Sequence, residues 1–242
     1  MAVTENQADV FTVGRKSFTA VAVNTAAKTG EWIKSRLGEF NRLEYKSSRR
    51  DLVTEVDKGA ELMIRNLIAT HFPDHVFFGE ESVTAETLEK ALEEAAAAEY
   101  AWIVDPIDGT TNFVHGFPFY CVSIALAHRG ELVVGVVYDP SHDEMFVAEK
   151  GKGAYLHGKP IRVSREERLA ESLLSAGFPG GRDDVLQNVE LVRHMIPRVR
   201  NIRMTGSAAL QLAYIAAGRL TGYWERGLQA WDIAAGALLV AE

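Results

Sequence analysis

The chain has 242 residues, of which 47% are hydrophobic and 24% charged, and its net charge is -7 at pH 7. This composition is typical of a globular protein and excludes a disordered chain, and the length suits one compact unit. Without a basic block, the chain is not expected to bind nucleic acid, which favours a small-molecule partner. Residues 1–30 contain neither a signal-peptide core nor a membrane span, so we expect a cytoplasmic protein.

Helical periodicity dominates the first part of the chain. Loosely spaced apolar residues predict one long or broken helix from Asn6 to Leu37, interrupted at Gly30. A sharper pattern predicts a second helix from Val56 to Phe72, which Thr54 can cap and Pro73 ends.

The rest of the chain is first rich in strands and then alternates strands with helices. We expect strands at 76–79, 101–104, 120–128, 132–138, 144–149, 153–156 and 160–163, and a helix at 86–100. Turn sequences between the later strands predict an antiparallel meander. Strands at 172–177, 199–204 and 220–224 should alternate with helices at 184–195, 207–217 and from 230 onward. The last helix runs to Glu242 without a stop signal, so we expect either a shortened chain or a fold that lacks a final strand and helix.

These patterns predict a single unit over residues 1–242. Residues 1–165 should supply the first helices and the antiparallel sheet, and residues 166–242 an α/β half. No repeat or low-complexity linker separates the two parts.

Acidic residues gather beside three predicted strands. The clusters are Gly79-Glu80-Glu81-Ser82, Asp105-Pro106-Ile107-Asp108-Gly109-Thr110, and Glu225 with Trp231-Asp232. Carboxylates that converge raise one another's pKa unless a cation neutralises them. The ligands would all be oxygen atoms, without a cysteine cluster or paired histidines, which selects Mg²⁺ or Mn²⁺ over Zn²⁺ or copper. The clusters therefore predict a magnesium site.

The spacing of Asp105 and Asp108 has a specific use. A turn just beyond a strand lets both carboxylates and an intervening carbonyl face one point, and Pro106 stiffens that turn. Gly109 and Thr110 then supply backbone N–H groups that suit a phosphate dianion. Metal and phosphate sites are thus expected to adjoin, although each pattern taken singly also fits a solvated loop.

The longer string from Trp102 to Phe113, WIVDPIDGTTNF, is more specific than its parts. With Gly-Glu-Glu-Ser before it and Trp231-Asp-Ile-Ala-Ala-Gly near the end, it resembles the signature pair of the inositol monophosphatase family. The order of predicted elements agrees over nearly the whole chain. The resemblance implies a mixed α/β fold, a layered αβαβα sandwich of the inositol monophosphatase and fructose-1,6-bisphosphatase type, and a homodimer. It also implies a Mg²⁺-dependent phosphatase that hydrolyses a small phosphate monoester, with inositol monophosphate the expected substrate.

The resemblance assigns metal ligands to individual residues. It implies two or three magnesium ions, for which Mn²⁺ is a possible substitute, held by Glu80, Asp105, the carbonyl of Ile107, Asp108 and Asp232. Asp105 would be shared between two ions, and Glu80 would also help to hold a third, looser ion.

The resemblance implies catalytic and substrate-binding residues as well. Asp57 and Thr110 would orient the attacking water, with Glu80 the third catalytic residue, and residues 46–57 would form a mobile loop and the following helix. Water activated by the metal would attack phosphorus in line, while a second ion steadies the leaving oxygen, so no phosphoenzyme is needed. The phosphate and alcohol would contact Lys46, Asp108, Gly109, Thr110, Gly206, Ser207, Ala208 and Glu225.

Several of these residues have a structural alternative. Asp57 suits the first turn of a helix, Lys46 suits a solvated loop, and Glu225 with Arg226 suits an exposed ion pair. His115 has no second metal-type partner and is expected to be structural. Core positions are expected for Trp102, Trp224, Trp231 and Cys121.

Other functions also fit parts of the pattern. Sibling phosphatases for fructose 1,6-bisphosphate, histidinol phosphate or NADP use the same metal chemistry, because the ions recognise the phosphate and not the alcohol. The Thr-Thr-Asn-Phe after Gly109 resembles inositol monophosphatases more than relatives that hydrolyse nucleotide 3'-phosphates. A non-catalytic binding relative would have lost metal ligands, all of which are present here. A scaffold subunit in RNA processing would need a basic face that the composition does not suggest.

Overall fold

The computed structural model describes residues 12–13, 16–38, 43–45, 52–178 and 182–242. Its α-helices in this part of the chain are α1 (Phe18–Ser35), α2 (Glu55–Ala69), α3 (Leu88–Ala97), α4 (Thr110–Val114), α5 (Arg182–Met195), α6 (Ala208–Ala216) and α7 (Ala230–Ala241). A short 3-10 helix, η2 (Glu80–Ser82), follows the strand β5, and another, η3 (Leu169–Glu171), precedes β12.

The strands form one large sheet and several small ones. The large sheet has the order β11-β10-β9-β8-β7-β6-β5, and a small parallel sheet has the order β13-β12-β14. The large sheet is built from β5 (Val76–Gly79), β6 (Tyr100–Asp108), β7 (Cys121–His128), β8 (Glu131–Asp139), β9 (Glu144–Glu149), β10 (Gly153–Leu156) and β11 (Lys159–Pro160). The small parallel sheet contains β12 (Leu173–Ala176), β13 (Asn201–Arg203) and β14 (Gly222–Trp224). Two further pairs are β1 (Thr12–Val13) with β2 (Lys16–Ser17) and β3 (Leu43–Tyr45) with β4 (Leu52–Thr54).

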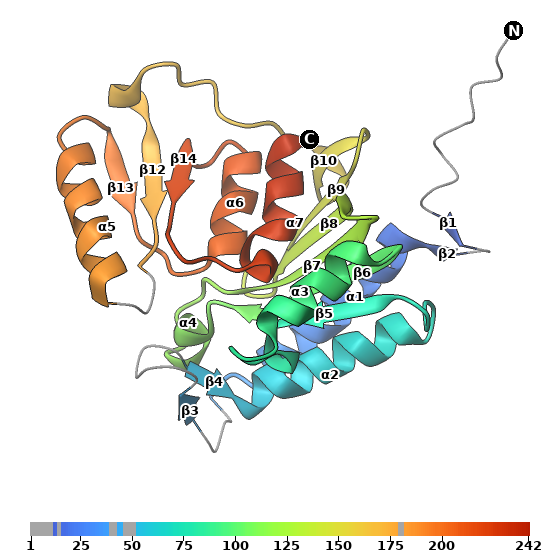
Figure 1. Cartoon of the computed structure of the whole chain (residues 1–242). Helices are drawn as coiled ribbons and strands as arrows, with labels where there is room; N and C mark the ends of the chain where they lie inside the picture. The colour runs from blue at the N-terminus through green and yellow to red at the C-terminus, as the bar shows by residue number, and fades with distance from the viewer. Residues whose placement is uncertain (1–11, 14–15, 39–42, 46–51, 179–181) are drawn as a thin grey trace, which may run out of the picture.

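Helical and sheet layers alternate through the molecule. In Figure 1, α1 and α2 cover one face of the large sheet, α6 and α7 lie between the two sheets, and α5 covers the outer face of the small sheet. This is the layered αβαβα order expected from the sequence, and the mixed α/β class is confirmed. The predicted meander is also present, since neighbouring strands from β6 to β11 are antiparallel.

The large sheet is buried on both faces because successive side chains of a strand point to opposite sides. In β7, Val122 and Ile124 pack in the cluster formed with α1 and α2, whereas Cys121 and Ala125 pack in the cluster formed with α6 and α7. Cys121 and Trp102 are both buried, as predicted. Trp231 is also buried, against Phe78, while Trp224 is only half-buried.

The first helix differs from its prediction in two ways. It begins at Phe18 and not near Asn6, because β1 and β2 pair antiparallel immediately before it, while residues 6–11 lie outside the described part. It also runs through Gly30 without a break. A Cβ at Gly30 would lie 2.4 Å from Cδ1 of Tyr138, so this glycine permits close contact with β8.

The strand that leads to the aspartates is longer than predicted. β6 continues to Asp108, four residues beyond the predicted end at Val104, and its pairing with β7 shifts register between Asp105 and Asp108. Such an irregularity bends the strand and redirects its side chains. The strand predicted at 160–163 is wrong, because β11 contains only Lys159–Pro160 and ends where the prediction begins.

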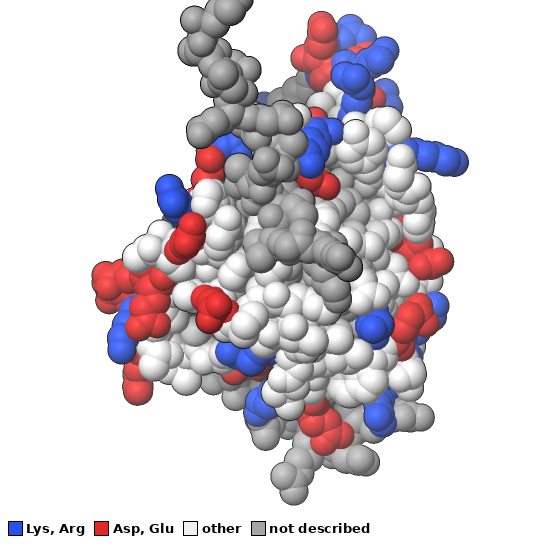
Figure 2. Space-filling view, turned by 90° about the vertical axis from the view of Figure 1, so that its right-hand side faces the viewer, with Lys and Arg blue, Asp and Glu red and all other residues white. Residues whose placement is uncertain are grey.

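The surface carries charges of both signs. Figure 2 shows acidic and basic side chains interspersed among uncharged residues, with basic side chains most numerous at the upper edge of that view. Among the described residues, each helix is too short or too polar to cross a membrane.

Candidate metal and phosphate site

The site begins where β6 bends. Asp105 and Asp108 are 2% and 8% exposed, so both carboxylates are removed from bulk water. The backbone N–H of Ile107 donates to Oδ1 of Asp105 at 3.0 Å. This local bond closes the turn that Pro106 was expected to stiffen.

Strand register brings Glu80 to the same place. β5 lies parallel to β6 with Gly79 opposite Val104, so the residues that follow, Glu80 and Asp105, lie side by side. The charge of Glu80 and hydrogen bonding with its side chain both contribute to the raised pKa of Asp105. Two of the predicted carboxylates are therefore close enough to perturb each other.

Asp108 is bound to the first turn of α6. Its Oδ2 accepts hydrogen bonds from the Ser207 hydroxyl and the Ala209 N–H, both at 2.6 Å, and its Oδ1 accepts from the Ala208 N–H at 3.2 Å. The first N–H groups of a helix have no partner inside the helix and carry partial positive charge. The aspartate therefore joins the large sheet to the N-terminus of α6.

Asp232 lies at the start of α7. Its Oδ2 accepts a 2.6 Å hydrogen bond from the N–H of Gln229, which forms a capping box at the helix N-terminus. Asp105 and Asp108 on β6 and Asp232 on α7 are thus brought together from two layers.

The carboxylates of this site perturb one another. Burial, followed by the charges of Glu80, Asp108 and Asp232, raises the pKa of Asp105 well above its usual range. Burial raises the pKa of Asp108 to about 6, although its hydrogen bonds from Ser207 and the α6 backbone lower it. Burial and then the charge of Asp108 raise the pKa of Asp232 to about 8. Asp105 therefore experiences the charges of the other three predicted carboxylate ligands.

The donor set fits a hard divalent cation. All of the gathered side chains are carboxylates, and their mutual repulsion is the condition that a bound Mg²⁺ or Mn²⁺ relieves. In the orientations observed for the described residues, no three His, Cys, Asp or Glu side chains stand close enough to hold one ion. It is therefore the chemistry of these oxygen donors that matches a hard divalent cation.

Thr110 and Asp57 meet beside the carboxylates. The Thr110 hydroxyl lies 3.0 Å from Oδ1 of Asp57 and 3.1 Å from the carbonyl oxygen of Ile107, and can donate to either. Asp57 is 1% exposed and lies in the first turn of α2, so its position at the helix start, foreseen as the structural alternative, coexists with this contact. Gly109, at φ +100°, precedes α4 and allows the chain to turn there.

Two glycine-containing segments close one side of the site. A Cβ at Gly109 would lie 3.0 Å from the carbonyl oxygen of Phe119 and 3.3 Å from that of Gly206, so these backbones are in close contact. The amide of Asn112 donates to the carbonyls of Phe119 and Thr205, both at 2.6 Å. Asn112 thus ties the segment after α4 to the segment before α6.

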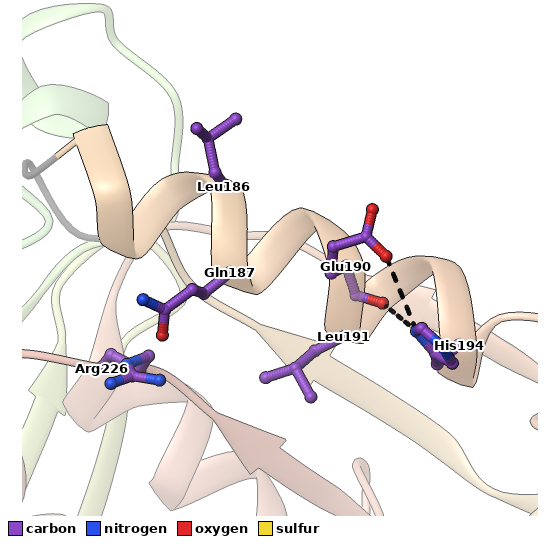
Figure 3. A pocket seen from close by; sticks show the side chains of 6 residues that line it. All are labelled: Leu186, Gln187, Glu190, Leu191, His194 and Arg226. Atoms are coloured by element: carbon purple, nitrogen blue, oxygen red, sulfur yellow. Dashed lines mark hydrogen bonds and ion pairs between the residues drawn. The ribbon is translucent and has the colours of Figure 1, made fainter.

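Glu225 lies at the edge of the carboxylate group. The Tyr223 hydroxyl donates to Oε2 of Glu225, and the charge of Asp108 adds to burial in raising the pKa of Glu225. A Cβ on Gly177 would lie 1.6 Å from the same oxygen, so the missing side chain makes room for the carboxylate. Arg226, by contrast, lines a hollow along α5 with Leu186, Gln187, Glu190, Leu191 and His194 (Figure 3).

Most of the predicted site residues therefore come together, with the exception of Lys46, which lies outside the described residues. His115, which was not expected to bind a metal, is exposed at the end of α4. The structure adds Glu61, Asn112 and Tyr223, which the sequence reasoning missed. A signal existed for Glu61, because it follows Asp57 by four residues and therefore lies on the same face of α2.

The sequence from residue 15 to residue 242 matches the model of the inositol monophosphatase family. The chain belongs to this family. It is 44% identical to inositol monophosphatase 2 of Solanum lycopersicum over 230 residues, which cover 94% of this chain and 85% of the relative.

Solved structures of the family superpose on the same fold. The extragenic suppressor protein suhB of Bartonella henselae is 41% identical, with a TM-score of 0.82 over 92% of this chain and 83% of that one. The inositol monophosphatase of Anabaena sp. PCC 7120 is 36% identical, with a TM-score of 0.79 over 93% of this chain and 81% of that one. The family is generally metal-dependent, which agrees with the carboxylate donor set.

Proposed function

We propose that this member of the inositol monophosphatase family is a Mg²⁺-dependent phosphatase that hydrolyses inositol monophosphate to inositol and phosphate. The observation that carries the proposal is the burial of Asp105 and Asp108 at the end of β6, within range of the charges of Glu80 and Asp232 and beside the Thr110–Asp57 pair.

Five oxygen-donating groups would hold the metal. They are the carboxylates of Glu80, Asp105, Asp108 and Asp232 and the carbonyl of Ile107, which keeps a second lone pair when it accepts from Thr110. When bound, divalent cations offset the charge of these acids and stabilise the negative charge that develops on the phosphate and the leaving oxygen. Mg²⁺ suits this set because it prefers carboxylate and carbonyl oxygen.

Asp57 and Thr110 would orient the water that attacks phosphorus. The Thr110 hydroxyl donates its hydrogen bond to Asp57 or to the carbonyl of Ile107, so its oxygen can accept a hydrogen bond from water. Asp57 can accept a second one. The water oxygen then forms a bond to phosphorus as the ester P–O bond breaks, and the proton that the water gives up balances the one that the leaving alkoxide takes up to become the free alcohol.

The remaining predicted residues would bind the two ends of the substrate. The backbone N–H groups of Gly109 and Thr110 suit the phosphate. Glu225 and the backbone of Gly206 to Ala208 suit the hydroxyls of the alcohol, since they border Asp108. Lys46 is proposed as a further phosphate contact.

The domain organisation, the oligomeric state and the cellular location are proposed from the resemblance to the inositol monophosphatase family. We take residues 1–242 as one unit, because the hydrogen bonds of Asp108 to Ser207 and Ala209 join the first 165 residues to the rest. A cytoplasmic homodimer is expected. Sedimentation of the purified protein at micromolar concentration would test the dimer, and a single monomeric species would contradict it.

Phosphate release from a panel of monoesters tests the function. Inositol monophosphate, fructose 1,6-bisphosphate, histidinol phosphate, NADP and a nucleotide 3'-phosphate would each be assayed with Mg²⁺ and with a chelator. We expect Mg²⁺-dependent release that is greatest for inositol monophosphate. It should be abolished by Asp105→Asn and retained by the exposed control Asp74→Asn. Release that is equal in chelator, or absent for every ester, would contradict the proposal, and preference for another ester would indicate a sibling activity.

A further inference from the structure

A second acidic residue of α2 lies directly under the turn that carries Glu80. Glu61 is 4% exposed, and its Oε2 accepts a 2.7 Å hydrogen bond from the backbone N–H of Glu81. The Ser82 hydroxyl donates to its Oε1. One buried carboxylate thus bonds the two residues that follow Glu80.

Glu61 also contacts the residue that precedes Glu80. A Cβ on Gly79 would lie 2.4 Å from Oε2 of Glu61, so only glycine leaves space for the carboxylate against the end of β5. The backbone on both sides of Glu80 is therefore in contact with the same side chain.

Arg65 completes the arrangement from the next turn of α2. Its Nη2 lies 3.6 Å from Oε1 of Glu61 and also donates to the Ser82 hydroxyl. The arginine partly offsets the charge of the buried acid. Glu61 is thereby held in one orientation, with one oxygen towards Glu81 and the other towards Ser82 and Arg65.

Packing a helix against a sheet through a buried carboxylate has a high free-energy cost. Burying it is costly unless several donors compensate, and an apolar side chain of similar size is often at least as stabilising. Glu61 lies one helical turn after Asp57, so the same face of α2 reaches both the Thr110 hydroxyl and the Glu80 turn. This placement favours a role in the site over packing alone.

We propose that Glu61 is a positioning residue that fixes η2 so that the Glu80 carboxylate stays beside Asp105. In this proposal Glu61 binds neither substrate nor metal, and acts through its contacts with Gly79, the Glu81 N–H and the Ser82 hydroxyl on either side of Glu80. The proposal rests on the proposed function in one respect, the assignment of Glu80 as a metal ligand.

Magnesium binding without substrate provides the test. Titration calorimetry of Glu61→Gln should give a dissociation constant for Mg²⁺ about 10- to 100-fold higher than wild type, the range typical for residues that orient metal ligands. The hydrolytic rate at saturating Mg²⁺ should change much less. Glu93→Gln on the exposed face of α3 removes the same charge and should leave Mg²⁺ affinity unchanged.

The double variant Glu61→Gln/Glu80→Gln separates positioning from a general loss of stability. If Glu61 acts through Glu80, the double variant should bind Mg²⁺ no more weakly than Glu80→Gln alone. Ser82→Ala, which removes one exposed donor, should show a smaller effect in the same direction. Losses that add fully, or unchanged Mg²⁺ affinity in Glu61→Gln, would overturn the inference. A Glu80→Gln variant with unchanged affinity would instead contradict the proposed metal site.

Discussion

The Thr110 hydroxyl donates a 3.0 Å hydrogen bond to Asp57, a residue 53 positions earlier in the chain. Thr110 begins α4 just after the end of β6, and Asp57 lies in the first turn of α2 on one face of the large sheet. This contact therefore couples the helix that follows the aspartates to the layer beneath the sheet.

Replacing Thr110 by valine should lower kcat far more than it changes KM. Valine keeps the shape but removes the hydroxyl that contacts Asp57 and would orient the attacking water. Positioned proton-transfer groups typically contribute about 10²- to 10⁴-fold, so we expect a fall in that range at saturating Mg²⁺. Steady-state kinetics would measure it, with the exposed neighbour substitution Thr111→Val as the control. An unchanged kcat in Thr110→Val would remove the residue from the mechanism.

The metal-free protein should become less stable as the pH rises from about 4 to 8. Burial raises the pKa of Asp108 to about 6 and that of Asp232 to about 8, and also raises the pKa of Asp105. The folded state then binds more protons than the unfolded state, so the free energy of unfolding falls as these groups ionise.

Thermal unfolding at several pH values, in chelator and in Mg²⁺, would measure this dependence. The stabilisation by Mg²⁺ should grow with pH, because the ion binds the ionised carboxylates. Asp232→Asn should flatten the chelator curve between about pH 4 and 8, most visibly above pH 6, where Asp108 is already ionised in both states. Should that variant keep the wild-type slope, Asp232 would not be the group responsible.

Ser207→Ala should destabilise the fold as well as the site. The Ser207 hydroxyl donates to the buried Asp108 carboxylate at 2.6 Å. Hydrogen bonds to charged groups contribute about 1.5–3 kcal/mol, so the free energy of unfolding should fall by about that amount. Urea denaturation would measure it, with Ser35→Ala at the exposed end of α1 as the control. An equal fall in the free energy of unfolding in the two variants would show that the hydrogen bond to Asp108 does not add to stability beyond that of an exposed serine.

Tyr223→Phe should raise KM only for substrates whose alcohol carries hydroxyl groups. The Tyr223 hydroxyl donates to Glu225, the proposed contact of the substrate alcohol. Without it, KM for inositol monophosphate should rise about 2- to 10-fold, the value of one ordinary hydrogen bond. KM for an aryl phosphate without hydroxyls should stay the same, as should both values in the control Tyr155→Phe. A parallel rise for both substrates would indicate general damage to the site.

The elements that were predicted best are those whose signals are local. α2 follows from its apolar face and from Pro73, and the small parallel sheet follows from the alternation of strands and helices. The errors arise where distant contacts decide. Gly30 was read as an interruption because its partner, Tyr138, lies 108 positions later and cannot be found by local spacing.

The candidate site likewise contains residues that local spacing predicts and residues that only distant contacts place. Asp105, Asp108 and Thr110 form one short string with recognisable spacing, and the structure brings them together with Glu80 and Asp232. Glu61 and Tyr223 act on their neighbours through side-chain contacts that depend on how α2 and β14 pack. The spacing of Glu61 from Asp57 indicates its helix face but not its partners, and no sequence signal indicates the contact of Tyr223, so the partners themselves require coordinates.

The helices α6 and α7 fill the layer between the two sheets, and each begins at the site, with Ser207 before α6 and Asp232 in the first turn of α7. A ribosome therefore finishes β6, with its two buried aspartates, long before it makes the groups that complete their surroundings. Nascent chains that stop short of α7 would expose the aspartates of β6 to water and would lack a complete site. Enzyme activity should accordingly appear only when translation has passed Asp232, in a single step.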